Sequence, residues 1–169
     1  MQRDRLGIPD RSEELESWIE DYFGIHELFS VINSSTGLIE WKISERKIWR
    51  EGVAALEVKF GQDNGVSLTY LPRTLSSESK DLGATRTPAR LYCTLNGESL
   101  LWKYYNKSIE LDTIYFEGND DITFMGKIDT DHYEPRLFFL RFKQKSGEWT
   151  WVVNDSEHTH VIEVIDEEE

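Results

Sequence analysis

The chain has 169 residues and a formal net charge of −13 at pH 7, and 38% of its residues are hydrophobic, 30% charged and 12% aromatic. A chain of this length and aromatic content is expected to fold as one domain around a single core, which excludes a disordered protein. The acidic balance disfavours direct nucleic-acid binding, which depends on clustered Lys and Arg, and no stretch approaches the roughly 18 apolar residues of a membrane-spanning helix.

Residues 1–11 are predicted to be a charged lead-in to the fold. Gly7 and Pro9 interrupt this segment, and no apolar run follows its charged start as it would in a secretory signal. The only cysteine, Cys93, lies within an alternating apolar run, which is typical of a small buried thiol. These features predict a soluble protein of the reducing cytoplasm, with residues 1–169 forming a single domain.

Residues 12–33 have the spacing of a helical segment. Ser12 offers a hydroxyl for an N-cap, and apolar residues follow at helical spacing, namely Leu15, Trp18, Ile19, Tyr22 and Phe23. Gly24 is expected to end or bend this helix, and a second piece then carries the same period to Asn33. The sequence therefore predicts an N-terminal helix with a short continuation.

From residue 38 onward the apolar period changes to two, and residues 38–165 are predicted to form an antiparallel β-meander of about ten strands. Asn96-Gly97 favours a tight hairpin turn, and a change of parity near Asp112 predicts a β-bulge. The segment 72–87 lacks apolar alternation and is predicted to be a long loop, either functional or mobile. A last strand, 160–165, precedes an acidic tail at residues 166–169.

The order of these elements predicts a mainly β fold with a minor helical part. Many short strands that each bury one face solve the problem of their exposed edges by closing into a barrel or by packing as two sheets. We expect a closed or partly open barrel, whose architecture resembles that of lipocalin-like barrels. A two-sheet β-sandwich uses the same alternation and is the alternative.

His158 and His160 are the best candidates in the sequence for binding a metal. Residues two apart in a strand point to the same face, so both imidazoles could reach one ion. A third ligand would come from Asp131 or His132, because Glu163 has the opposite parity. The same spacing also fits two surface histidines at the end of a strand, without a metal.

Motifs for catalysis are scarce in this chain. The sequence contains neither a glycine-rich phosphate loop nor a Gly-x-Ser-x-Gly nucleophile motif. We therefore expect a non-enzymatic protein without a cofactor. A metal-dependent enzyme that uses His158 and His160 is the third of three hypotheses about function.

Acidic residues are concentrated in the predicted helix and in the tail, which suggests that the partner is a basic surface of another protein. The first hypothesis is thus an acidic interaction protein, such as an inhibitor, an immunity-type protein or an adaptor. Its predicted partner-binding residues are Glu13, Glu16, Trp18, Glu20, Asp21, Trp149 and Trp151. The second hypothesis is a barrel that encloses a small apolar or aromatic ligand between aromatic walls.

Overall fold

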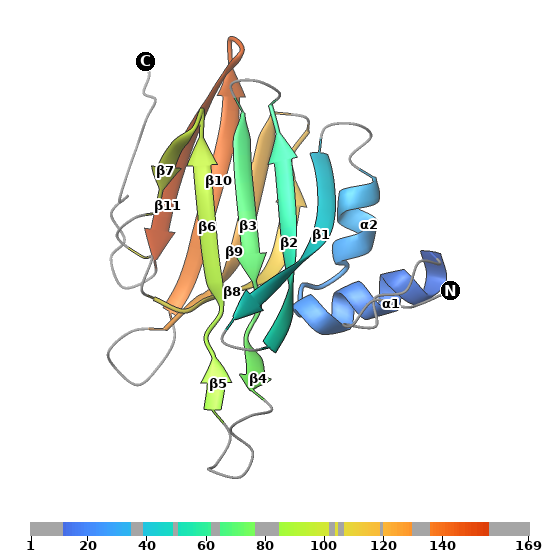
Figure 1. The fold of residues 1–169 in the computed structure, drawn as a ribbon. Coiled ribbons are helices and arrows are strands. Elements are labelled where there is room, and N and C mark those ends of the chain that lie inside the picture. The colour runs from blue at the N-terminus through green and yellow to red at the C-terminus, as the bar shows by residue number, and fades with distance from the viewer. Residues whose placement is uncertain are drawn as a thin grey trace.

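The computed structural model describes residues 12–34, 39–48, 51–61, 65–76, 85–101, 104, 107–118, 120–129 and 136–155. Within these residues, two helices precede eleven strands, which form a five-stranded sheet, a four-stranded sheet and a two-stranded ladder (Figure 1). All strand pairs are antiparallel. The predicted mainly β class with an N-terminal helix is confirmed.

The helical segment consists of α1 (Ser12–Phe23) and α2 (Leu28–Asn33). The first helix ends where Gly24 takes a φ of +70°, which lies in the left-handed region that glycine enters without steric penalty. Ile19 and Phe23 are 0% and 2% exposed and belong to the main core. The bend expected at Gly24 is confirmed. Neither of the described helices has the length and apolar character needed to cross a bilayer.

The five-stranded sheet has the strand order β1-β2-β3-β6-β7. Its members are β1 (Ile39–Ile48), β2 (Glu51–Phe60), β3 (Val66–Leu71), β6 (Arg90–Leu95) and β7 (Glu98–Leu100). Between β3 and β6, the short strands β4 (Thr74–Ser76) and β5 (Thr85–Thr87) pair with each other. The prediction of a loop throughout residues 72–87 was therefore wrong at these two strands, because a three-residue ladder with Leu75 as its one apolar residue is too short to show apolar alternation.

The four-stranded sheet has the order β11-β10-β9-β8. Its members are β8 (Ile109–Phe116), β9 (Asp121–Ile128), β10 (Arg136–Lys145) and β11 (Glu148–Asp155). The register of β8 against β9 shifts between Leu111 and Thr113, so the bulge predicted near Asp112 is confirmed. A Cβ atom at Gly126, opposite the bulge, would lie 2.0 Å from the backbone oxygen of Glu110, so glycine permits this close approach.

The core lies between the inner faces of the two sheets. The ring of Phe60 on β2 packs against the rings of Phe124, Phe142 and Trp149, with centroid separations of 6.3, 5.4 and 5.1 Å. The sheets do not close into a ring, so the structure is a sandwich or open barrel. Of the predicted architectures, the fully closed barrel is therefore not formed.

The two helices cover the side of the sandwich where β1 and β8 form the sheet edges (Figure 1). Helix α2 contacts both of these strands. The backbone N–H of His26, in the link between the helices, donates to the carbonyl oxygen of Asp112 at 2.9 Å. This contact pairs a backbone group of the edge strand β8 and holds the end of α1 beside the bulge.

Candidate functional site

Helix α1 combines a buried apolar side with an acidic exposed side. Its sequence, SEELESWIEDYF, has five acidic residues and no basic residue. The acidic side chains that the structure describes are exposed or partly exposed, and we call them the acidic face: Glu14, Glu16, Glu20 and Asp21. The backbone of Glu13 belongs to the same helix, but its side chain lies outside the described residues.

The acidic face differs from the sheets in how its charges are balanced. On the five-stranded sheet, Arg46 and Lys42 approach the Glu57 carboxylate at 3.0 and 3.8 Å. The Ser44 hydroxyl and the Arg46 guanidinium donate hydrogen bonds to Glu57 and hold the pKa of its carboxyl below the usual range. Among the described residues, no cation forms an ion pair with any member of the acidic face.

An aromatic pair borders the acidic face. Trp18 is partly exposed, and its ring stacks on Tyr22 with a centroid separation of 4.7 Å and an interplanar angle of 17°. The phenol oxygen of Tyr22 accepts the backbone N–H of Ala54 at 3.0 Å, and burial raises the pKa of this phenol. The Trp18 ring is thus held by its neighbour, with part of its surface open to solvent.

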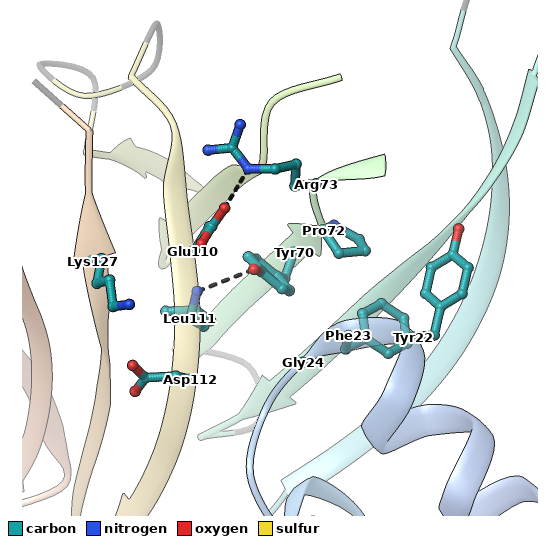
Figure 2. A pocket seen from close by; sticks show the side chains of 10 residues that line it. All are labelled: Tyr22, Phe23, Gly24, Tyr70, Pro72, Arg73, Glu110, Leu111, Asp112 and Lys127. Atoms are coloured by element: carbon teal, nitrogen blue, oxygen red, sulfur yellow. Dashed lines mark hydrogen bonds and ion pairs between the residues drawn. The ribbon is translucent and has the colours of Figure 1, made fainter. Parts of the chain in front are cut away.

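A cavity of about 300 Å³ lies where α1, the end of β3 and β8 meet (Figure 2). We call it the rim pocket. Aromatic side chains line one part of it, and charged side chains line another (Figure 2). The aromatic residues are Tyr22, Phe23 and Tyr70, and the charged residues are Arg73, Glu110, Asp112 and Lys127. Tyr22 lines the rim pocket and also stacks on Trp18. The rim pocket therefore adjoins the aromatic pair that borders the acidic face.

Two side chains, one at the end of β3 and one in the link after it, build the wall of the rim pocket through hydrogen bonds. The phenol oxygen of Tyr70, which is 1% exposed, accepts the backbone N–H of Leu111 at 3.1 Å. Burial raises the pKa of Tyr70, so this phenol is neutral at physiological pH. The Arg73 guanidinium donates to the Glu110 carboxylate and, at 3.1 Å, to Asp129. These bonds join the end of β3 to β8 and to the residue after β9.

Trp149 and Trp151 do not lie with the acidic face, although they were grouped with it from sequence. They are 6% and 7% exposed and point into the core from β11, because they share the parity of the fully buried Val153. Among the residues that the structure describes, their indole N–H groups have no hydrogen-bond partner. Of the predicted partner-binding residues, α1 therefore places Glu16, Trp18, Glu20 and Asp21 on one helix at the surface.

The predicted metal ligands Asp131, His132, His158 and His160 lie outside the described residues. The part of the chain that the structure describes holds no group of three or more His, Cys, Asp or Glu side chains suited to a metal ion. Cys93 is 3% exposed, and burial raises the pKa of its thiol, which disfavours the reactive thiolate.

Sequence reasoning did not find the rim pocket, because its residues come from α1, β3, β8 and β9. The one local signal was the change of parity near Asp112, which marks the bulge at the pocket. No protein-family model, curated protein or solved structure was found to match the chain.

Proposed function

We propose that this chain is a non-enzymatic interaction protein, such as an inhibitor, an immunity-type protein or an adaptor, whose acidic face binds a basic surface of another protein. The observation that carries this proposal is the set of carboxylates on α1 that have no ion-pair partner among the described residues. Exposed charges that are not balanced locally project their field into solvent, and they attract an oppositely charged surface.

The neighbouring side chains suit this role. The partly exposed Trp18 ring offers a large apolar surface that a partner can desolvate, and tryptophan is among the residues that most often supply binding energy at interfaces. The rim pocket lies beside it and offers a hollow that a partner side chain can enter. Charge would then guide the encounter, while Trp18 and the rim pocket would slow dissociation.

A small aromatic ligand is the second candidate, and the rim pocket is the observation that favours it. Between the sheets, the space around Phe60 is filled by the rings of Phe124, Phe142 and Trp149, so the candidate ligand site is at the rim. The volume of the rim pocket lies at the lower end of the roughly 300–1,000 Å³ of small-molecule sites. Tyrosine fluorescence during titration with small aromatic compounds would detect such binding. If the Tyr70→Phe variant bound these compounds with the same affinity as the wild type, this result would argue against the rim pocket as the site.

The test of the main proposal compares two matched triple variants. Glu14→Gln, Glu16→Gln and Asp21→Asn remove three charges from α1, whereas Glu40→Gln, Glu98→Gln and Glu148→Gln remove three exposed charges from the sheets. Affinity capture from native lysate should retain a basic protein on the wild type and on the sheet variant, and should lose it on the α1 variant. Equal capture by the two variants would contradict the proposal.

The association rate of the purified pair provides a second measurement. Raising the ionic strength from about 0.01 M to about 0.15 M shortens the Debye length from about 30 Å to about 8 Å. If the acidic face steers the encounter, the association rate constant should fall on the order of tenfold. A rate that is independent of salt would remove the electrostatic basis of the proposal.

A further inference from the structure

Four charged side chains line the rim pocket, and two of them already have partners. The Arg73 guanidinium forms ion pairs with Glu110 and, outside the pocket lining, with Asp129. The other two, Asp112 and Lys127, are exposed and opposite in sign. Among the described residues, neither of them forms an ion pair. The rim pocket therefore offers one negative and one positive group to a ligand.

The β-bulge in β8 sets the position of Asp112. The register shifts between Leu111 and Thr113, so Asp112 is the extra residue and has no opposite residue on β9. Its backbone oxygen accepts the N–H of His26 at 2.9 Å, and its carboxylate accepts the neighbouring Thr113 hydroxyl at 3.1 Å. A bulge turns its extra residue away from the regular alternation of the strand. In this way the bulge places a carboxylate at the pocket, on a backbone that the link between the helices holds.

The two unpaired charges lie on one side of the rim pocket. Asp112 is in β8 and Lys127 is in the neighbouring strand β9, and Figure 2 shows both on the side away from α1. Tyr22 and Phe23 lie across the pocket, at the end of α1 (Figure 2). The lining is therefore charged at β8 and β9 and aromatic at α1, which suits a ligand with a charged part and an aromatic part.

Tyr70 supplies a hydrogen-bond donor that no described residue uses. Its phenol oxygen accepts the Leu111 N–H at 3.1 Å, but among the described residues no atom accepts its own O–H proton. The side chain is 1% exposed, and burial is the main cause of its raised pKa, to which the charges of Glu110 and Asp112 add. The proton therefore stays on the oxygen at physiological pH, and an acceptor on a ligand in the pocket would satisfy it.

Building on the proposed role of the rim pocket as a site for a small aromatic ligand, on which this inference rests, we propose that it binds a free α-amino acid with an aromatic side chain. The ligand carboxylate pairs with Lys127 and accepts the Tyr70 O–H, while the ligand ammonium group pairs with Asp112. The aromatic ring of the ligand packs against Tyr22 and Phe23. Each part of the zwitterion then meets a group of matching chemistry.

Other small aromatic ligands leave part of the lining unmatched. An aromatic carboxylate would leave Asp112 without a cation, and an aromatic amine would leave Lys127 without an anion. A neutral aromatic compound would leave both groups unpaired, and covering an unpaired charge opposes binding. The volume of about 300 Å³ lies at the lower end of small-molecule sites, which favours a single amino acid over a peptide.

Isothermal titration calorimetry of the full chain compares four probes that share one phenyl ring. L-phenylalanine carries both charges, 3-phenylpropionate only the carboxylate, phenethylamine only the ammonium group, and N-acetyl-L-phenylalanine amide neither. L-phenylalanine should bind about fivefold more tightly than either singly charged probe, which is the upper end of what a partly exposed ion pair contributes. Equal affinity for the four probes would overturn the inference and leave the rim pocket as an aromatic-ligand site. Binding of none of them would overturn both.

Two variants assign the ligand charges to their partners. Lys127→Gln should weaken the binding of L-phenylalanine and 3-phenylpropionate about fivefold and leave phenethylamine unchanged. Asp112→Asn should weaken L-phenylalanine and phenethylamine by the same factor and leave 3-phenylpropionate unchanged. Both residues are exposed, so the substitutions preserve the fold.

The matched controls are Lys143→Gln and Asp120→Asn, which remove exposed charges outside the pocket lining. Both control proteins should bind every probe as the wild type does. If Lys127→Gln and Asp112→Asn weakened all probes equally, or weakened none, the affinity would not follow the charges of the ligand. Either result would overturn the inference.

Discussion

The phenol oxygen of Tyr70 accepts the backbone N–H of Leu111 at 3.1 Å, and this hydrogen bond joins the two sheets inside the protein. Tyr70 lies near the end of β3, and Leu111 lies in β8 next to the bulge. Tyr70 and Leu111 are 1% and 2% exposed, so water cannot replace either partner. The bond therefore contributes to stability and shapes the wall of the rim pocket.

The Tyr70→Phe variant should be less stable than the wild type. It removes the acceptor and leaves the Leu111 N–H buried without a partner, which costs about 1–3 kcal/mol in the free energy of unfolding. Urea denaturation measures this difference. Tyr92→Phe is the matched control, because Tyr92 is 43% exposed, and it should lie within about 0.5 kcal/mol of the wild type. Equal stability of the two variants would show that the bond has no net effect.

Stability should also fall in alkaline solution. Burial raises the pKa of Tyr70 and of Tyr22 in the folded protein, whereas tyrosines in the unfolded chain ionise near pH 10. A group whose pKa is raised by folding contributes fully to the free energy of unfolding at pH values below its pKa in the unfolded chain. This contribution is lost as the pH rises toward the pKa of the group in the folded protein. The free energy of unfolding should therefore decrease above about pH 10. In the Tyr70→Phe variant the free energy of unfolding should decrease less steeply with pH than in the wild type. Equal slopes for the two proteins would contradict the assignment of this pH dependence to Tyr70.

Gly126→Ala should destabilise the four-stranded sheet at the bulge. The added Cβ would lie 2.0 Å from the backbone oxygen of Glu110, so β8 must move away. Overpacking of this kind costs about 1–3 kcal/mol, which thermal unfolding would detect. Lys127→Ala, one residue further along β9 and exposed, is the control and should have little effect. If the Gly126→Ala protein were as stable as this control, β8 would be able to move away from β9 at the bulge without a loss of stability.

The Cys93 thiol should react slowly in the folded protein. It is buried, and burial raises its pKa, so both access and the thiolate fraction are low. Labelling with a chromogenic disulfide reagent should proceed much faster in denaturant than in buffer. Rapid labelling of the native protein would indicate that β6 opens readily at this position.

Local sequence patterns were sufficient to predict several elements of this fold. The N-terminal helix, its end at Gly24 and the bulge near Asp112 each follow from residues close together in the chain. The ladder between β4 and β5 was missed, because its two three-residue strands are too short to show an alternation of apolar and polar side chains. Patterns of period two identify strands by the face that they bury, and a strand without that contrast gives no signal.

The sequence by itself determined the helix–strand order, the alternating faces and the absence of basic residues in α1, because each depends on neighbouring residues along the chain. Only the tertiary structure decided that Trp149 and Trp151 face the core and that Tyr70 meets Leu111. The same packing decided that the sheets stay open and that α1, β3 and β8 line the rim pocket. These features depend on contacts between distant segments, and alternation within a strand specifies two faces without specifying which elements will cover them.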